Sequence, residues 1–118
     1  SLLSISVQVY GKPEIMGKIP AGAFYPSPKI DSAIVKIDLY TQPIIPVQIL
    51  DDFFRLAKAG FSQKRKTLRN SLAGGMQMEP REAEILLIES DIDPRRRAET
   101  IHLEEWKTIT ENYQRRSR

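Results

Sequence analysis

The sequence contains no cysteine and only one histidine, His102. Without cysteine the chain cannot form disulfides, use a thiol nucleophile or bind a metal through thiolates. No nucleophile and base pair stands out, because His102 is alone and falls where a helix N-cap is predicted. The lack of cysteine fits a reducing, cytoplasmic setting, and we expect no metal site.

Long apolar runs are also missing. No segment approaches the roughly 20 apolar residues of a membrane span, and Ser1 to Tyr10 lacks the basic front of a secretory signal. We therefore expect a soluble protein with no membrane partner. A glycine-rich phosphate loop is not found, since Gly11 and Gly74-Gly75 have neither the spacing nor the preceding strand. The chain starts with serine and enters apolar sequence directly, which predicts a fragment of a longer protein.

The overall charge is only mildly basic. The 118 residues carry a formal net charge of +3, with a pI near 9.3. A polyanionic partner must therefore be argued from the clustering of cations and not from their total. The length suffices for one compact domain, or for a piece of one with a small second unit.

The sequence before Val47 mixes apolar and extended patterns. Ser1 to Tyr10 is ambiguous, because its apolar residues alternate as in a strand but also fit one side of a helix; propensity alone favours a strand. Prolines make Ala21 to Lys29 an extended loop. Ala33 to Leu39 is dominated by β-branched residues and predicts a strand. Two prolines mark Thr41 to Pro46 as a linker, where we place a domain boundary.

From Val47 onward the apolar residues recur at helical spacing. Start and stop residues predict four helices: Val47 to Gly60, one capped by Ser62 and stopped by Gly74-Gly75, Pro80 to about Ser90, and Leu103 to about Arg115. Asp93-Pro94 is a further cap and first-turn pair, which predicts a helix start at the arginines that follow it.

Cations crowd the second of these helices with no acidic residue among them. A run of lysine and arginine is usually only a solvated face, and from this run alone that interpretation is as good as a binding role. Nearby hydroxyl and amide side chains add neutral donors for phosphate oxygens, and a second cluster stands at the other predicted helix start. Together the two clusters predict a surface for a nucleic-acid backbone. They consist of Lys64, Arg65, Lys66 and Arg69, and of Arg95, Arg96 and Arg97.

Two aromatic residues, Phe24 and Tyr25, lie between the prolines of the extended loop. An aromatic side chain on a stiff loop can stack on an unpaired or flipped base, which is worth roughly 1 to 3 kcal/mol per base. The simpler interpretation is a loop aromatic that covers the core beneath it, and the loop alone favours this second interpretation.

Three motifs carry a family resemblance. FYPSPKIDSAIVKI, from Phe24 to Ile37, resembles a Phe-x-Pro-x-Pro-x-Val-x-Ser-x-Val signature. FSQKRKTLRNSL, from Phe61 to Leu72, is similar to a Phe-x-x-Arg-Arg-Lys-x-Leu-Arg-Asn signature. IDPRRRAETIHLEEW, from Ile92 to Trp106, is similar to an Asp-Pro-x-x-Arg-x-Glu-x-Leu-x-x-Glu-Glu-Phe tail. These are the signatures of ribosomal RNA adenine dimethyltransferases, the KsgA group, which the chain therefore resembles. The departures are mild: Ile30 for Val, Lys64 for Arg, His102 for Ser and Trp106 for Phe.

The resemblance implies an enzyme that moves methyl groups from S-adenosylmethionine to N6 of two adjacent adenosines near the 3′ end of small-subunit ribosomal RNA. It implies an α+β fragment: residues 1–42, with a helix and two terminal strands, end a Rossmann-like methyltransferase domain, and residues 43–118 form a helical C-terminal rRNA-binding domain. Because the family has a helix at the position of Ser1 to Tyr10, it overrides the strand propensity there.

Residue roles follow from the same resemblance. Phe24 looks like the aromatic that flanks the flipped adenine, which reverses the simpler interpretation above. The cations of the two clusters look like part of the rRNA-binding surface, and Leu68 and Asn70 look structural. The family's cofactor loop and Asn-Leu-Pro-Tyr motif are not in the sequence. We therefore expect that this chain alone neither binds S-adenosylmethionine nor methylates RNA, and that its partner is rRNA in an immature small subunit.

Two other functions remain open at this point. One is an autonomous helical protein that binds RNA or DNA and has no catalytic parent. The other is a non-catalytic transcription-factor relative of the methyltransferases. A fragment with only two strands would also expose sheet edges, so self-association through these edges is a further expectation.

Overall fold

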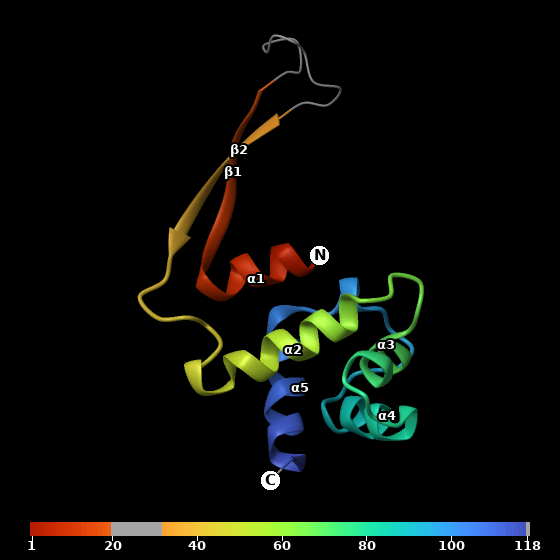
Figure 1. The fold of residues 1–118 in the computed structure, drawn as a ribbon. Helices are drawn as coiled ribbons and strands as arrows, with labels where there is room; N and C mark the ends of the chain where they lie inside the picture. Colours follow the sequence, from red (N-terminus) through yellow and green to blue (C-terminus); the bar gives the residue numbers. More distant parts are fainter. Residues whose placement is uncertain (20–31, 118) are drawn as a thin grey trace.

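The computed structural model describes residues 1–19 and 32–117. Figure 1 shows a long two-stranded hairpin that rises away from a body of helices, with the first helix, α1, between the hairpin and α2. Of the described helices, none is long and apolar enough to cross a membrane.

Helix α1 spans Leu2–Tyr10. The Ser1 hydroxyl accepts a hydrogen bond from the Ser4 amide at 3.2 Å and so caps its start. Ile5 and Val9 are buried one turn apart, at the spacing of a helix face. The helix that the family resemblance predicts is therefore confirmed, and tertiary packing overrides the strand propensity of this segment.

The hairpin pairs β1, Gly11–Ile19, with β2, Ser32–Leu39, in antiparallel register. The strand predicted over Ala33 to Leu39 is confirmed as part of β2, and β1 begins directly after α1, at Gly11. A Cβ atom on Gly11 would lie 2.7 Å from the Asp38 carbonyl oxygen, so only glycine allows this close approach. Pro13 is tolerated in β1 because β1 is an edge strand of a two-stranded sheet.

The helical body has α2, α3, α4 and α5 around one core. Their bounds, with those of the short 3-10 turns η2 and η3, are η2 Val47–Ile49, α2 Leu50–Phe61, α3 Leu68–Gly75, α4 Pro80–Glu89, η3 Ala98–Thr100 and α5 Leu103–Arg116. The third and fourth predicted helices are confirmed. Trp106 and Phe53 are the largest fully buried side chains, and Val9 of α1 joins the same core.

The second predicted helix is wrong over its first half. Helix α2 continues through Gly60, which packs so closely on Trp106 that a Cβ atom would lie 2.6 Å from the ring. Ser62 ends α2 and is not an N-cap: its hydroxyl donates to the Ala59 carbonyl at 2.6 Å. The next helix, α3, begins only at Leu68. Three of the four clustered cations therefore precede the helix.

The predicted helix start at the arginines after Pro94 is also wrong. Asp93 caps a turn, because its carboxylate accepts from the Arg95 amide at 2.9 Å, but only the single turn η3 follows. The predicted N-cap at His102 is confirmed. Its amide donates to the Glu105 carboxylate at 2.9 Å, which is half of a capping box.

Candidate nucleic-acid interface

Lys64, Arg65 and Lys66 lie on the turn between α2 and α3, which we call the basic turn. All three side chains are exposed. The Lys66 amide donates to the Gln63 carbonyl at 3.2 Å, and this bond closes the turn. None of the three forms an ion pair with another described residue. Their charge is therefore available to an external anion.

Arg69 lies on α3 and differs from the cations of the basic turn. Its guanidinium is 3.7 Å from the Glu84 carboxylate of α4, and its side chain is 42% exposed. The helix thus directs Arg69 toward α4, where a carboxylate already neutralises part of its charge. The predicted surface role of Arg69 is weaker in this geometry than that of Lys64, Arg65 or Lys66.

The segment Asp93 to Arg97, which we call the arginine loop, docks against the start of α3. The Leu68 amide donates to the Arg96 carbonyl at 2.7 Å, and the Arg69 amide donates to the Pro94 carbonyl at 3.2 Å. These bonds join two cationic segments that are distant in sequence. They also occupy two amides at the start of α3, so these amides are not available to an anion, and side chains would have to contact it.

Arg96 lies at the centre of this junction. Its guanidinium reaches both carboxylate oxygens of Glu105, at 2.6 and 3.1 Å, and also donates to Thr100. The hydrogen bond from Arg96 holds the pKa of Glu105 below its ordinary range, and Glu105 in turn raises the pKa of Arg96. Arg96 therefore fixes the arginine loop to the start of α5, and its charge is already paired.

Arg95 and Arg97 are the exposed cations of the arginine loop. Arg95 is 87% exposed and lies 2.9 Å from the Asp93 carboxylate. This hydrogen bond lowers the pKa of Asp93 to about 2. Arg97 forms no ion pair with a described residue. The interface thus consists of five exposed cations on two joined segments: Lys64, Arg65, Lys66, Arg95 and Arg97.

Phe24, the predicted base-stacking residue, lies outside the described residues. A cofactor cradle is not found within the described ranges, where the glycines lie in β1, α2 and α3 and form no strand-turn-helix loop. No group of three or more described His, Asp and Glu side chains is placed to bind a metal ion.

The sequence alone did not indicate that Arg96 is paired, because its partner Glu105 is nine residues away. One local signal was present: Glu105 stands three residues after His102, at the position of a capping box. The bond from the His102 amide fixes the Glu105 carboxylate at the start of α5, where the Arg96 guanidinium also reaches it.

Known proteins resemble this chain over most of its length. The family described as "Ribosomal RNA adenine dimethylase" matches residues 1–115. A "Ribosomal RNA small subunit methyltransferase A" of Dehalococcoides mccartyi is 46% identical over 108 residues, which are 92% of this chain and 37% of that protein. The protein of the same name from Desulfitobacterium hafniense is 43% identical over 110 residues, 93% of this chain and 39% of that protein.

Two solved structures share the fold. The crystal structure of a dimethyladenosine transferase from Plasmodium falciparum has a TM-score of 0.74 at 19% identity, over 99% of this chain and 50% of that one. The 23S rRNA methyltransferase ErmE has a TM-score of 0.66 at 20% identity, over 95% of this chain and 45% of that one. At these identities the likeness concerns the fold alone.

The C-terminal placement that the sequence motifs predicted is corrected by the comparisons. They assign the matched segment to the N-terminal part of the relatives, so the prediction of a C-terminal fragment is wrong for the fold class and for the function. The chain spans only 37% to 39% of the length of those relatives.

A family match over nearly the whole chain and identities above 40% to curated relatives agree with the three motifs found in the sequence. The chain belongs to the ribosomal RNA adenine dimethylase family.

Proposed function

We propose that this chain is the part of an rRNA adenine dimethyltransferase that binds ribosomal RNA, through the basic turn and the arginine loop. One observation carries the proposal: the bonds from the Leu68 and Arg69 amides to the arginine-loop carbonyls join the two cationic segments into one surface. A surface of this kind neutralises backbone phosphates and positions the RNA without reading its sequence.

The charges on this surface differ in how freely they can bind. The cations of the basic turn have no partner among the described residues, whereas Arg95 must be shared with Asp93. Log affinity falls as log salt rises, and we expect each lost phosphate contact to make this slope shallower by about 0.7 to 0.9. The basic turn should therefore contribute more to this slope than the arginine loop.

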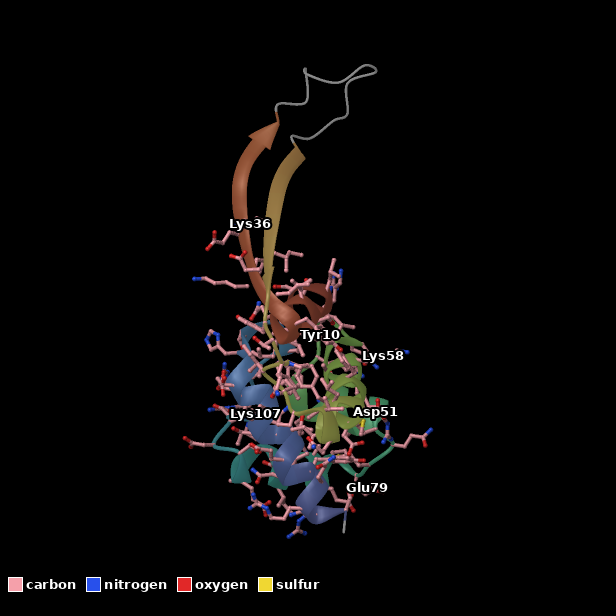
Figure 2. The ribbon with its side chains drawn as sticks, turned by 90° about the vertical axis from the view of Figure 1, so that its left-hand side faces the viewer. Tyr10, Lys36, Asp51, Lys58, Glu79 and Lys107 are labelled. Atoms are coloured by element: carbon pink, nitrogen blue, oxygen red, sulfur yellow. The ribbon has the colours of Figure 1, made fainter. Side chains whose placement is uncertain are left out.

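The direct test is RNA binding by a double variant, Arg65→Ala with Arg97→Ala, which removes one free cation from each segment. Affinity for a small-subunit rRNA fragment should fall, and the slope of log affinity against log salt should become shallower by about 1.4 to 1.8. Lys107→Ala is the matched control, since Figure 2 shows Lys107 on α5, away from Lys58 of α2. An unchanged slope in the double variant would mean that the cations are only a solvated face.

The finer features of the function belong to the same proposal. The substrate is rRNA of an immature small subunit, which would place the protein in the cytoplasm. The methyl donor of the full-length enzyme is S-adenosylmethionine. Because the described residues form no cofactor cradle, this chain alone should neither bind the donor nor methylate RNA. Calorimetric titration of the chain with S-adenosylmethionine should give only heats of dilution, and a saturable micromolar isotherm would contradict this.

A further inference from the structure

A groove of about 420 Å³ lies between the second half of α2 and the end of α3. All of its walls come from these two helices and the residues directly after them. Its volume lies within the range of small-molecule sites. The polar side chains that line it are those of Arg55, Lys58, Ser62 and Gln77. Ser62 stands two residues before Lys64, so the groove adjoins the basic turn.

The floor of the groove is made by two small residues, Ala59 of α2 and Gly75 at the end of α3. A Cβ atom on Gly75 would lie only 2.4 Å from the Cβ atom of Ala59. The two helices therefore approach this closely only because residue 75 has no side chain. Small residues on the floor leave the space above it to the polar side chains of the two walls.

Gln77 forms one wall and has an unfavourable backbone conformation. Its φ is 55°, in the left-handed region, and it directly follows Met76, the C-cap of α3. The Met78 amide donates to the Ala73 carbonyl at 3.0 Å, which is the bond of a Schellman motif. Glycine is the usual residue at this position because it has no Cβ atom. A strained residue with an exposed amide side chain in a groove points to a role for that side chain.

The opposite wall carries two cations, Arg55 and Lys58, which lie one turn apart on α2. Lys58 is exposed and forms no ion pair with a described residue. Arg55 is 61% exposed and lies 3.3 Å from the Asp52 carboxylate, which also accepts from the Gln114 amide at 3.0 Å. Lys58 thus offers the freer charge, and together the two cations attract a phosphate.

The neutral groups of the groove match a hydroxyl group. The Ser62 hydroxyl donates to the Ala59 carbonyl at 2.6 Å, so its oxygen remains as an acceptor. The Gln77 side-chain amide can both donate and accept. The 2′-hydroxyl of a ribose also donates and accepts, and DNA lacks this group. Two cations beside such a pair of neutral groups fit one ribose and its phosphate.

We propose that this groove binds one ribose-phosphate unit of the RNA strand that crosses the basic turn. The phosphate lies beside Lys58 and Arg55, and the 2′-hydroxyl lies beside Gln77 and Ser62. The proposal rests on the proposed function, because the RNA on the basic turn supplies this unit. Phosphate contacts alone do not distinguish RNA from DNA, so the groove adds this selectivity to the surface.

Gln77→Gly separates a binding role from a structural one. Glycine adopts the positive φ without strain, so the melting temperature of the variant should not fall. Its affinity for a single-stranded RNA oligonucleotide should fall about two- to fivefold, the scale of one lost hydrogen bond. Its affinity for the DNA oligonucleotide of the same sequence should stay unchanged. Filter binding and thermal unfolding measure these effects. Equal falls for RNA and DNA, or no fall for either, would overturn the proposal.

Lys58→Ala tests the phosphate position. It should weaken RNA and DNA alike and make the slope of log affinity against log salt shallower by about 0.7. Arg55→Ala should have a smaller effect, because Asp52 already shares its charge. Lys107→Ala is again the control and should change neither the affinity nor the slope. A slope for Lys58→Ala equal to that of the control would place the phosphate outside the groove and contradict the proposal.

The two proposals fail in different ways. If only the groove is misassigned, Arg65→Ala with Arg97→Ala still lowers the affinity for rRNA, while Gln77→Gly and Lys58→Ala bind like the unaltered protein. If the RNA surface itself is misassigned, the double variant binds rRNA like the unaltered protein.

Discussion

The basic turn and the arginine loop have similar sequences, Lys-Arg-Lys and Arg-Arg-Arg, but the structure uses their charges differently. All three side chains of the basic turn are exposed and without an ion-pair partner among the described residues. In the arginine loop, Arg95 pairs with Asp93 and Arg96 with Glu105. The cations of the basic turn are thus free to bind an anion, whereas two of the three arginines in the arginine loop already form ion pairs within the protein. The density of charged residues in a sequence does not show whether their side chains are free or held in ion pairs.

The largest effect should come from Arg96→Ala. Its guanidinium ties the arginine loop to α5, and its removal leaves the partly buried Glu105 carboxylate without a cationic partner. Because both side chains are about 30% exposed, we expect a loss of about 1 to 2 kcal/mol in the free energy of unfolding. Urea denaturation measures this loss.

The matched control is Arg95→Ala, which removes a neighbouring arginine that is 87% exposed. Its free energy of unfolding should stay close to that of the unaltered protein, because an exposed ion pair contributes little to stability. Equal losses of unfolding free energy in the two variants would show that Arg96 does not hold the arginine loop. The proposed difference between a paired and an exposed arginine would then be wrong.

A smaller effect is expected from acid. The pKa of Glu105 is lowered from its ordinary value of 4.5, chiefly by the hydrogen bond from Arg96. Its contribution to stability is therefore present above pH 4.5 and is lost as the pH falls through the lowered pKa of the folded state. Glu105→Gln should flatten the fall of the melting temperature in that acid range, which thermal unfolding at several pH values measures. A curve of unchanged steepness would contradict the role of this pair.

The smallest effect should come from Asp93→Asn. This change releases Arg95 from its carboxylate and adds one free cation to the surface, so affinity for rRNA should rise about two- to fivefold at low salt. Filter binding at two salt concentrations measures the change. The same substitution at Asp51, an exposed residue of α2, is the control for net charge. Equal gains from both variants would assign the effect to total charge.

The sequence predicted the parts of the fold that depend on local pattern. Ala33 to Leu39, Pro80 to about Ser90 and Leu103 to about Arg115 have clear periods and end residues, and the structure confirms them. The start of α3 was missed because Ser62 is a good N-cap by its type alone. In the structure Gly60 packs closely on Trp106, far away in sequence, and α2 continues to Phe61 with Ser62 as its C-cap, so Ser62 cannot start the next helix.

The candidate site was predictable in composition but not in arrangement. The sequence indicated both clusters, whereas their junction depends on the arginine-loop carbonyls that accept from Leu68 and Arg69. Backbone carbonyls carry no sequence signal, so no pattern could have indicated this contact. For the same reason the different positions of Arg69, directed to Glu84, and Arg96, directed to Glu105, were not foreseen.

The hydrogen bond from the Leu68 amide to the Arg96 carbonyl also sets an order of events during synthesis. The basic turn is translated well before the arginine loop, and Glu105 comes later still. A nascent chain that ends before this glutamate has all the cations of the basic turn but no fixed surface on which to present them. Amide hydrogen exchange at Leu68 would report when that surface forms, because its protection begins only when the arginine loop arrives.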